Sequence, residues 1–182
     1  VSGFSRTVET PLQTFALYVA DTPGVLNRVV SLFRRRGVNI VSLTVGGTER
    51  PGISRMTIMV DADERGARQL ELYLRKLVPV LKVTNISQMD GVARDLVLLK
   101  VRADHTQRVH VLEVAHVFRA RVVDVGPESV IIEATGQHTK IDRLLEVLAP
   151  FGIIEMARTG SVVMTRDAPA PAIGARPAAH VA

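Results

Sequence analysis

The segment Asp21-Thr22-Pro23-Gly24 carries the clearest chemical pattern in this sequence of 182 residues. A glycine just before a helical pattern lets a ligand approach the backbone, and the free N–H groups that begin a helix attract a carboxylate. Asp21 can receive an ammonium group, while Val25 and Leu26 offer an apolar lining. Asn39, at the start of the next predicted strand, adds an amide that donates and accepts hydrogen bonds. These groups suit a small apolar amino acid; the alternative interpretation is a simple strand-to-helix turn.

Patterns for catalysis or metal binding are weak. The sequence contains no P-loop, no G-x-G-x-x-G and no G-x-S-x-G motif. With no cysteine, it has no disulfide, no thiolate zinc site and no cysteine nucleophile. His110, Glu113 and His116 lie three residues apart on a predicted helix, so their side chains fan over about 120° instead of converging on a metal. We interpret them as a solvent-facing helix edge, and predict neither a metal site nor an active site.

The net charge of +5 raises the question of nucleic acid or membrane partners. Acidic residues are interleaved with the basic ones, and Arg34-Arg35-Arg36 falls in the last turn of a predicted helix, where cations offset the negative end. We therefore predict no nucleic-acid partner. No apolar run approaches the ~20 residues of a membrane span, and the N-terminus lacks the apolar stretch of a signal peptide. We expect a cytoplasmic protein without membrane contact.

The elements that must position the Asp21–Gly24 segment follow the order β-α-β-β-α-β over residues 12–87. Phe15, Leu17 and Val19 alternate on one face of the first strand, and a helical stripe begins at Val25. We expect Thr22 to cap this helix and Pro23 to occupy its first turn. The predicted strands are 15–20, 38–45, 53–60 and 80–86, with helices that end at Gly37 and Pro79.

The same order is predicted again over residues 95–166, after a linker at 88–94. The segment 33–40 has its counterpart in 118–125, 85 residues later, which indicates an internal repeat. Residues 167–182, rich in Ala and Pro, are predicted to form a disordered tail. The predicted fold class is α+β, with two ferredoxin-like βαββαβ domains. The predicted elements of the second domain are strands at 96–101, 122–125, 130–134, 153–157 and 162–164 and helices at 106–118 and 139–148.

The motif D-x-P-G-x-L at Asp21–Leu26 resembles the usual mark of the ACT domain, a ligand-sensing module found on many enzymes of amino-acid metabolism. Longer matches resemble, more specifically, the small subunit family of acetohydroxyacid synthase, also called acetolactate synthase. This resemblance covers about residues 12–166. The matching segments are 21–29, 32–40, 42–45, 54–58, 98–101, 118–120, 123–125, 133–140 and 158–160.

The resemblance implies a regulatory subunit of branched-chain amino-acid biosynthesis, with no catalytic site and no cofactor of its own. Its partner would be a catalytic subunit that holds thiamine diphosphate, a divalent metal and FAD. The small subunit of this family raises activity and confers feedback inhibition, usually by valine, which binds where two ACT domains pair as a homodimer. Carried onto this sequence, that effector site would comprise Asp21, Gly24, Val25 and Leu26 of one protomer with Asn39 and Ile40 of its partner.

Two other functions stay open at this point. A stand-alone tandem-ACT sensor that controls transcription or another enzyme would keep the pocket without the catalytic partner. A small enzyme would need an acid–base or nucleophilic cluster, which the sequence does not offer. In the second domain Asp104-His105-Thr106 stands in place of D-x-P-G, so we expect this domain to be structural or a subunit contact.

Overall fold

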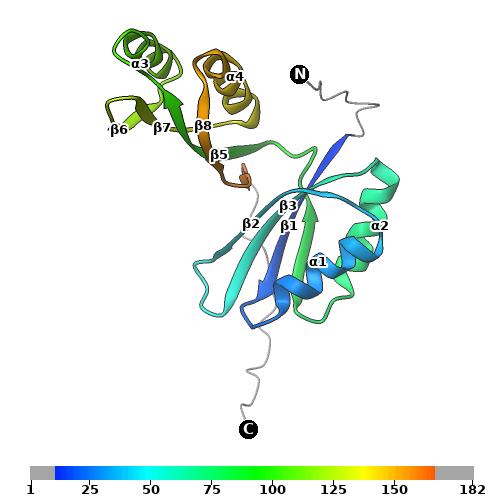
Figure 1. Ribbon diagram of the computed structural model, residues 1–182. Coiled ribbons are helices and arrows are strands. Elements are labelled where there is room, and N and C mark those ends of the chain that lie inside the picture. Colours follow the sequence, from blue (N-terminus) through cyan, green and yellow to red (C-terminus); the bar gives the residue numbers. More distant parts are fainter. Residues whose placement is uncertain (1–10, 167–182) are drawn as a thin grey trace. The chain divides into compact units, whose positions relative to one another are not determined.

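The computed structural model describes residues 11–166, which form two compact units (Figure 1). Within the described range, the first unit comprises 11–90 with 165–166 and the second comprises 91–164. Each unit contains an antiparallel sheet and two α-helices. The predicted α+β class with two βαββαβ units is confirmed.

The first unit is a four-stranded sheet in the order β2-β3-β1-β4. All neighbouring strands are antiparallel, so β1 and β2 run in the same direction on either side of β3. The strand order places β2 and β4 at the two edges of the sheet. The elements are β1 (Leu12–Ala20), α1 (Val25–Arg35), β2 (Ile40–Gly47), β3 (Ile53–Asp61), α2 (Glu64–Arg75) and β4 (Val80–Asn85).

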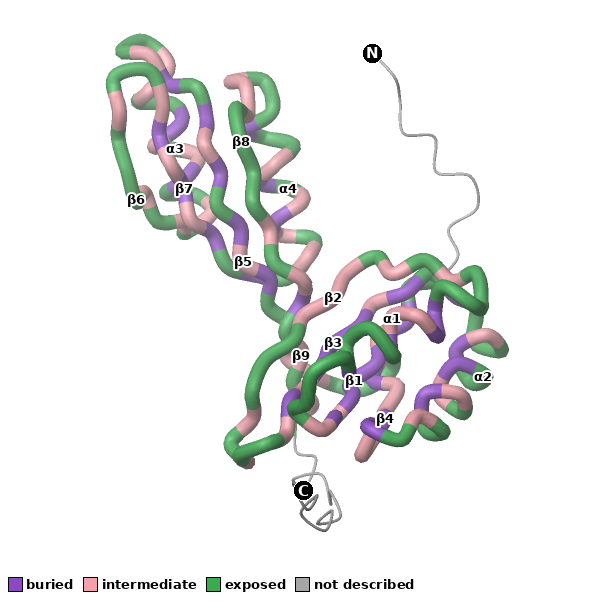
Figure 2. The backbone as a smooth tube through the Cα atoms, turned by 60° about the horizontal axis from the view of Figure 1, so that its bottom comes forward, coloured by how far each residue is buried: buried purple, intermediate pink, exposed green. Residues whose placement is uncertain are grey.

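The core of the first unit lies between one face of this sheet and both helices. The side chains predicted to alternate along one face of β1, Phe15, Leu17 and Val19, are buried in this core, and Figure 2 marks buried residues in purple. Leu32 and Phe33 of α1 and Leu70 and Leu74 of α2 pack against them. The amphipathic patterns therefore fix which side of each helix meets the sheet.

The start of α1 differs from the prediction. Thr22 is not the cap: Gly24 occupies the N-cap position with φ 82° and ψ −5°, and Pro23 precedes the helix. The carbonyl of Thr22 instead accepts the N–H of Val25 at 3.3 Å, which closes a tight turn. Such a turn needs a left-handed residue, and glycine adopts that conformation without the Cβ clash of other residues.

The second unit repeats this order around a sheet β6-β7-β5-β8, with β9 also paired to β5. The linker predicted over 88–94 is shorter, because β5 already begins at Gly91 and residues 91–94 belong to a paired strand. The prediction for 167–182 falls outside the described residues. The elements are β5 (Gly91–Arg102), α3 (Arg108–Val117), β6 (Arg121–Val125), β7 (Ser129–Gly136), α4 (His138–Leu148), the 3₁₀ turn η1 (Ala149–Phe151), β8 (Ile153–Arg158) and β9 (Val162–Thr165).

The internal repeat holds for the element order but not for the predicted residue correspondence. Gly37, with φ 66°, follows the last capping residue of α1, and Arg119, with φ 51°, follows that of α3. These equivalent positions are 82 residues apart, not 85. The reason is that α1 continues past Phe33 to its cap, whereas α3 already ends at Phe118. Phe33 therefore lies within a helix, whereas Phe118, its counterpart by sequence, is the residue at which a helix ends.

An ionic cluster around Asp95 ties the second unit together. Asp95 on β5 is 2% exposed and accepts hydrogen bonds from Ser161 and from Arg158 Nη2, the latter at 2.8 Å. His138 Nδ1 lies 2.9 Å from the same carboxylate, and Arg158 also pairs with Asp142 at 2.6 Å. Burial alone would raise the pKa of Asp95, but the hydrogen bonds from Ser161 and Arg158 lower it below its ordinary value.

Candidate effector site

Two backbone hydrogen bonds anchor the turn between β1 and α1. The N–H of Ala20 donates to the carbonyl of Pro79 at 2.8 Å, and the N–H of Asp21 donates to that of Gly52 at 2.9 Å. The turn is therefore fixed by the segments that precede β4 and β3. Its own side chains are left free to point outward, and every residue from Asp21 to Gly24 is exposed.

The first turn of α1 offers N–H groups to a ligand. In the described part of the chain, no side chain caps this helix. The N–H groups of Leu26 and Asn27 have no intrahelical acceptor, because an α-helix cannot supply one to its first turn. Space for a ligand is present, since a Cβ built on Gly24 would meet nothing within 4 Å. This end of α1 can accept a carboxylate.

The predicted apolar lining is only partly available. Leu26 is 43% exposed and lies beside the free N–H groups, as expected. Val25 is 5% exposed and belongs to the core cluster, so its side chain cannot contact a ligand in this arrangement. The periodicity of the helix already placed Val25 on the buried stripe, and the structure assigns it an anchoring role.

The remaining two predicted residues lie at the other end of the sheet. Asn39 is exposed and Ile40 half-buried, and the carbonyl of Asn39 accepts the N–H of Asp61 at 3.3 Å. Ile40 pairs with Val60, whereas Ala20 pairs with Ile53. The distance along β3 from Ile53 to Val60 is about 23 Å at ~3.3 Å per residue. One small ligand cannot touch both groups within a single chain.

In the second unit a carboxylate organises the turn that precedes α3, whose N-cap residue is Gln107. Asp104 Oδ1 accepts the N–H of Thr106 at 2.8 Å and that of Gln107 at 2.9 Å, together with the Thr106 hydroxyl at 2.6 Å. The hydrogen bond from that hydroxyl is the main reason why the pKa of Asp104 lies below its ordinary value. The sequence carries a signal for this turn, because an aspartate side chain often accepts the backbone N–H two residues later.

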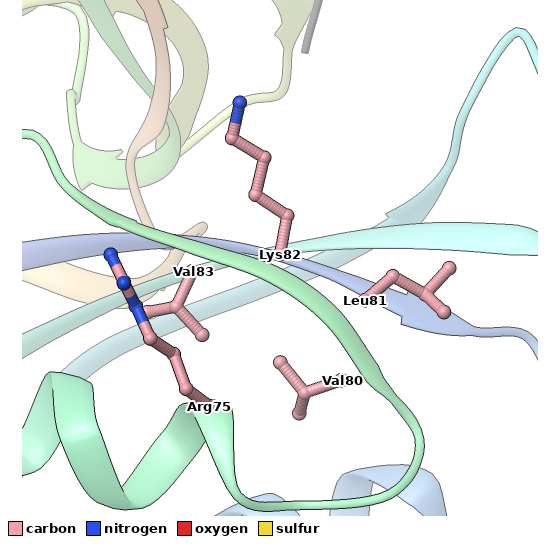
Figure 3. A pocket seen from close by; sticks show the side chains of 5 residues that line it. All are labelled: Arg75, Val80, Leu81, Lys82 and Val83. Carbon is pink, nitrogen blue, oxygen red and sulfur yellow. The ribbon is translucent and has the colours of Figure 1, made fainter. Parts of the chain in front are cut away.

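A different hollow lies between the end of α2 and the edge strand β4. It has a volume of about 360 Å³ and is lined by Arg75 and residues 80–83. Figure 3 shows Arg75 beside Val83, while Lys82 projects to the opposite side of the strand. Arg75 Nη2 is already paired with Glu71 at 2.5 Å. This hollow includes none of the predicted effector residues.

The histidines of α3 lie where the sequence places them. The side chains of His110 and Glu113 are 68% and 69% exposed and approach each other to 3.5 Å, and His116 is exposed. Across residues 11–166, no group of three or more His, Cys, Asp or Glu side chains is placed to hold a metal ion. None of the helices in that range is long and apolar enough to cross a membrane.

Comparison with known proteins gives concordant matches for both units. A family model described as the small subunit of acetolactate synthase matches residues 94–167, and one described as an AHAS small subunit-like ACT domain matches residues 15–82.

Relatives of known name match most of the chain. The acetolactate synthase small subunit of Mycolicibacterium smegmatis is 48% identical over 157 residues, which is 86% of this chain and 92% of the relative. A probable small subunit from Archaeoglobus fulgidus is 46% identical over 84% of this chain and 96% of its own length. The crystal structure of the Thermotoga maritima small subunit matches with a TM-score of 0.80 and 39% identity, covering 86% of this chain and 98% of that one.

Proposed function

This chain belongs to the acetolactate synthase small subunit family, and we propose that it senses valine at a site shared by two ACT domains. Family membership gives it a regulatory role in branched-chain amino-acid biosynthesis and a catalytic subunit as its partner. The finer proposal is that the chain activates this partner and confers feedback inhibition. We expect it to act in the cytoplasm.

The observation that carries the proposal is the separation of the two halves of the predicted site. The uncapped start of α1 lies at one end of β3, and Asn39 lies at the other. A site that uses both halves therefore needs a second chain, placed so that opposite ends of the two sheets meet.

The edge strand β2 is suited to form that pairing. Its eight residues, Ile40–Gly47, include no charged side chain, and Val41 and Val45 are 46% and 44% exposed. Of the other strands at the margins of the two sheets, β4, β6 and β8 each carry at least one charged residue, and β9, which is also uncharged, has only four residues. Charges on edge strands discourage pairing with another chain, so their absence favours β2 as the edge that pairs.

Antiparallel pairing of two β2 strands about a two-fold axis would bring the two halves together. In each chain Gly47, at the end of β2, lies in one row with Ser54 and Val19, next to the turn that precedes α1. The start of β2 in the partner would lie beside this end. Asn39 and Ile40 of one protomer would then face Asp21, Gly24 and Leu26 of the other, and symmetry would make two such sites.

Each group of the proposed site would recognise one part of valine. The N–H groups of Leu26 and Asn27 would bind the carboxylate, since the positive end of a helix favours an anion. Asp21 would pair with the ammonium group, and Asn39 would add a hydrogen bond. Leu26 and Ile40 would contact the branched side chain, while Val25 would hold the helix start in place from the core.

Regulation would arise from a difference in affinity. Valine would stabilise one geometry of the paired ACT domains, and the catalytic subunit would bind a different one more tightly. Such coupling is typically about 1–3 kcal/mol, a change of roughly 5–150-fold in affinity. The catalytic subunit would hold thiamine diphosphate, a divalent metal and FAD, and this chain would hold no cofactor.

Calorimetric titration of the chain with valine, leucine and isoleucine tests ligand binding. Activity of the catalytic subunit, with and without this chain and valine, tests the regulatory role. We expect one valine per chain, activation without valine, and inhibition with it. A stand-alone tandem-ACT sensor would bind the amino acid but neither co-purify with nor activate the catalytic subunit. No binding of any branched-chain amino acid would contradict the proposed site.

A further inference from the structure

The outward face of α3 is apolar where a solvent-exposed helix is normally polar. Val109 is 58% exposed and Val117 is 75% exposed. Together with Leu112, Glu113 and His116 they line an open groove of about 590 Å³. These five residues are called the α3 stripe below. Their spacing of three and four residues places them along one side of the helix.

The core of the second unit uses only one residue of this stripe, because Leu112 packs against it whereas Val109 and Val117 are exposed. Val111 and Ala115, on the opposite side of α3, are 0% and 1% exposed and already supply the contact with the sheet. The equivalent helix of the first unit, α1, uses exposed arginines on its outward side, among them Arg28 and Arg34. The exposed valines of α3 therefore indicate a contact with another surface.

The charges on α3 favour a second copy of the same helix as that surface. Glu113 lies three residues from His110 and three residues from His116. The same side of α3 therefore carries a carboxylate and imidazole groups that can pair with it, so two copies of this side can complement each other. We propose that two copies of α3 pack antiparallel about a two-fold axis, with the stripes facing each other. In this arrangement Glu113 of each copy lies opposite His116 of the other, and Leu112 lies opposite Val117. Both contacts occur twice, as an isologous interface requires.

The contact between two copies of α3 is too small to hold a dimer by itself. The ten residues of α3 span about 15 Å. Such a contact falls well below the roughly 800 Å² per partner of a stable interface. The inference therefore rests on the proposed pairing of ACT domains, which raises the local concentration of the second α3. It adds a self-contact that the effector site does not use.

The absence of cysteine from the sequence gives a clean cross-linking test. Full-length chains with Glu113→Cys and with His116→Cys, co-expressed under different tags, should form a disulfide between the two copies in high yield. Leu72→Cys, on the 60% exposed Leu72 of α2, is the control for random collision. Sedimentation of the same samples separates two failures. A monomeric chain contradicts the ACT pairing, whereas a dimer that cross-links no better than the Leu72→Cys control overturns the α3 contact.

A charge exchange tests the geometry of the contact. Glu113→Lys should weaken self-association by about tenfold, because it removes the carboxylate that would accept a hydrogen bond from His116 and places an ammonium group in the apolar contact. Combining Glu113→Lys with His116→Glu should restore it, since the exchanged charges again face each other. If Glu113→Lys instead abolishes co-purification with the catalytic subunit and leaves self-association unchanged, the catalytic subunit covers the stripe and the proposal is wrong.

Discussion

Asp21 and Asn39 lie at opposite ends of β3. The N–H of Asp21 donates to Gly52 at 2.9 Å just before the strand begins, and the carbonyl of Asn39 accepts from Asp61, its last residue, at 3.3 Å. Any ligand that contacts both residue types must therefore contact two chains. The proposed valine site depends on this relationship, and the predictions below test its parts.

Gly24→Asp should abolish valine inhibition and preserve activation. The new carboxylate would lie beside the N–H groups that we assign to the valine carboxylate, and the left-handed φ of 82° adds strain. We expect the valine affinity to fall more than tenfold, about 1.4 kcal/mol or more, in calorimetry. Gly152→Asp is a control for an aspartate at a positive φ outside the first unit, because Gly152 has φ 94° and ψ 101°. Native valine affinity in Gly24→Asp would argue against the assigned pocket.

Val45→Lys should convert a dimer into a monomer and remove valine binding with it. Val45 is 44% exposed on the uncharged edge strand β2, and a lysine there would oppose pairing with a second β2. Val125→Lys changes a valine of similar exposure, 49%, on the edge strand β6, and should leave the dimer intact. Sedimentation velocity distinguishes the two variants. A dimeric Val45→Lys protein would show that the chains pair through another surface.

Asp95→Ala should destabilise the second unit by about 2–3 kcal/mol, because Arg158 and Ser161 lose their shared acceptor. The pKa of Asp95 lies below its ordinary value of 3.8, so its contribution is present above that pH. It is lost as the pH falls through the folded-state pKa. Urea unfolding, followed by circular dichroism from pH 7 to pH 3, should show this loss in the native chain and not in Asp95→Ala. The exposed Asp124 gives the control, since Asp124→Ala should change little.

Much of the fold follows from local patterns in the sequence, because alternation along β1 and the helical stripe from Val29 to Phe33 each report one buried face. Features that depend on contacts between distant residues, or on unusual backbone geometry, do not follow from these local patterns. Gly24 rather than Thr22 is the N-cap residue of α1, because the turn before the helix needs a left-handed conformation. Asp95 and Arg158 are 63 residues apart and meet only through the pairing of β5 with β8.

The sequence proposes residues for the candidate site but does not give their arrangement. The motif from Asp21 to Leu26 predicts an amino-acid-binding turn without any structure, and binding itself stays a prediction. The edge position of β2 requires the strand order, which the sequence does not state. Val25 is predicted as part of the apolar lining, although its place on the buried stripe argues against contact with a ligand. In the second unit Asp104-His105-Thr106 replaces the D-x-P-G motif, and Asp104 binds N–H groups of its own turn.

A mixed dimer tests the shared site most directly. Asp21→Ala and Asn39→Ala should each abolish valine binding in pure form. Co-expressed under different tags and purified as a mixed dimer, they should regain one site, formed by Asp21 of one protomer and Asn39 of the other. Calorimetry should then find one valine per mixed dimer at native affinity. If the mixed dimer binds no valine, although each variant pairs normally, the site is not shared between two chains.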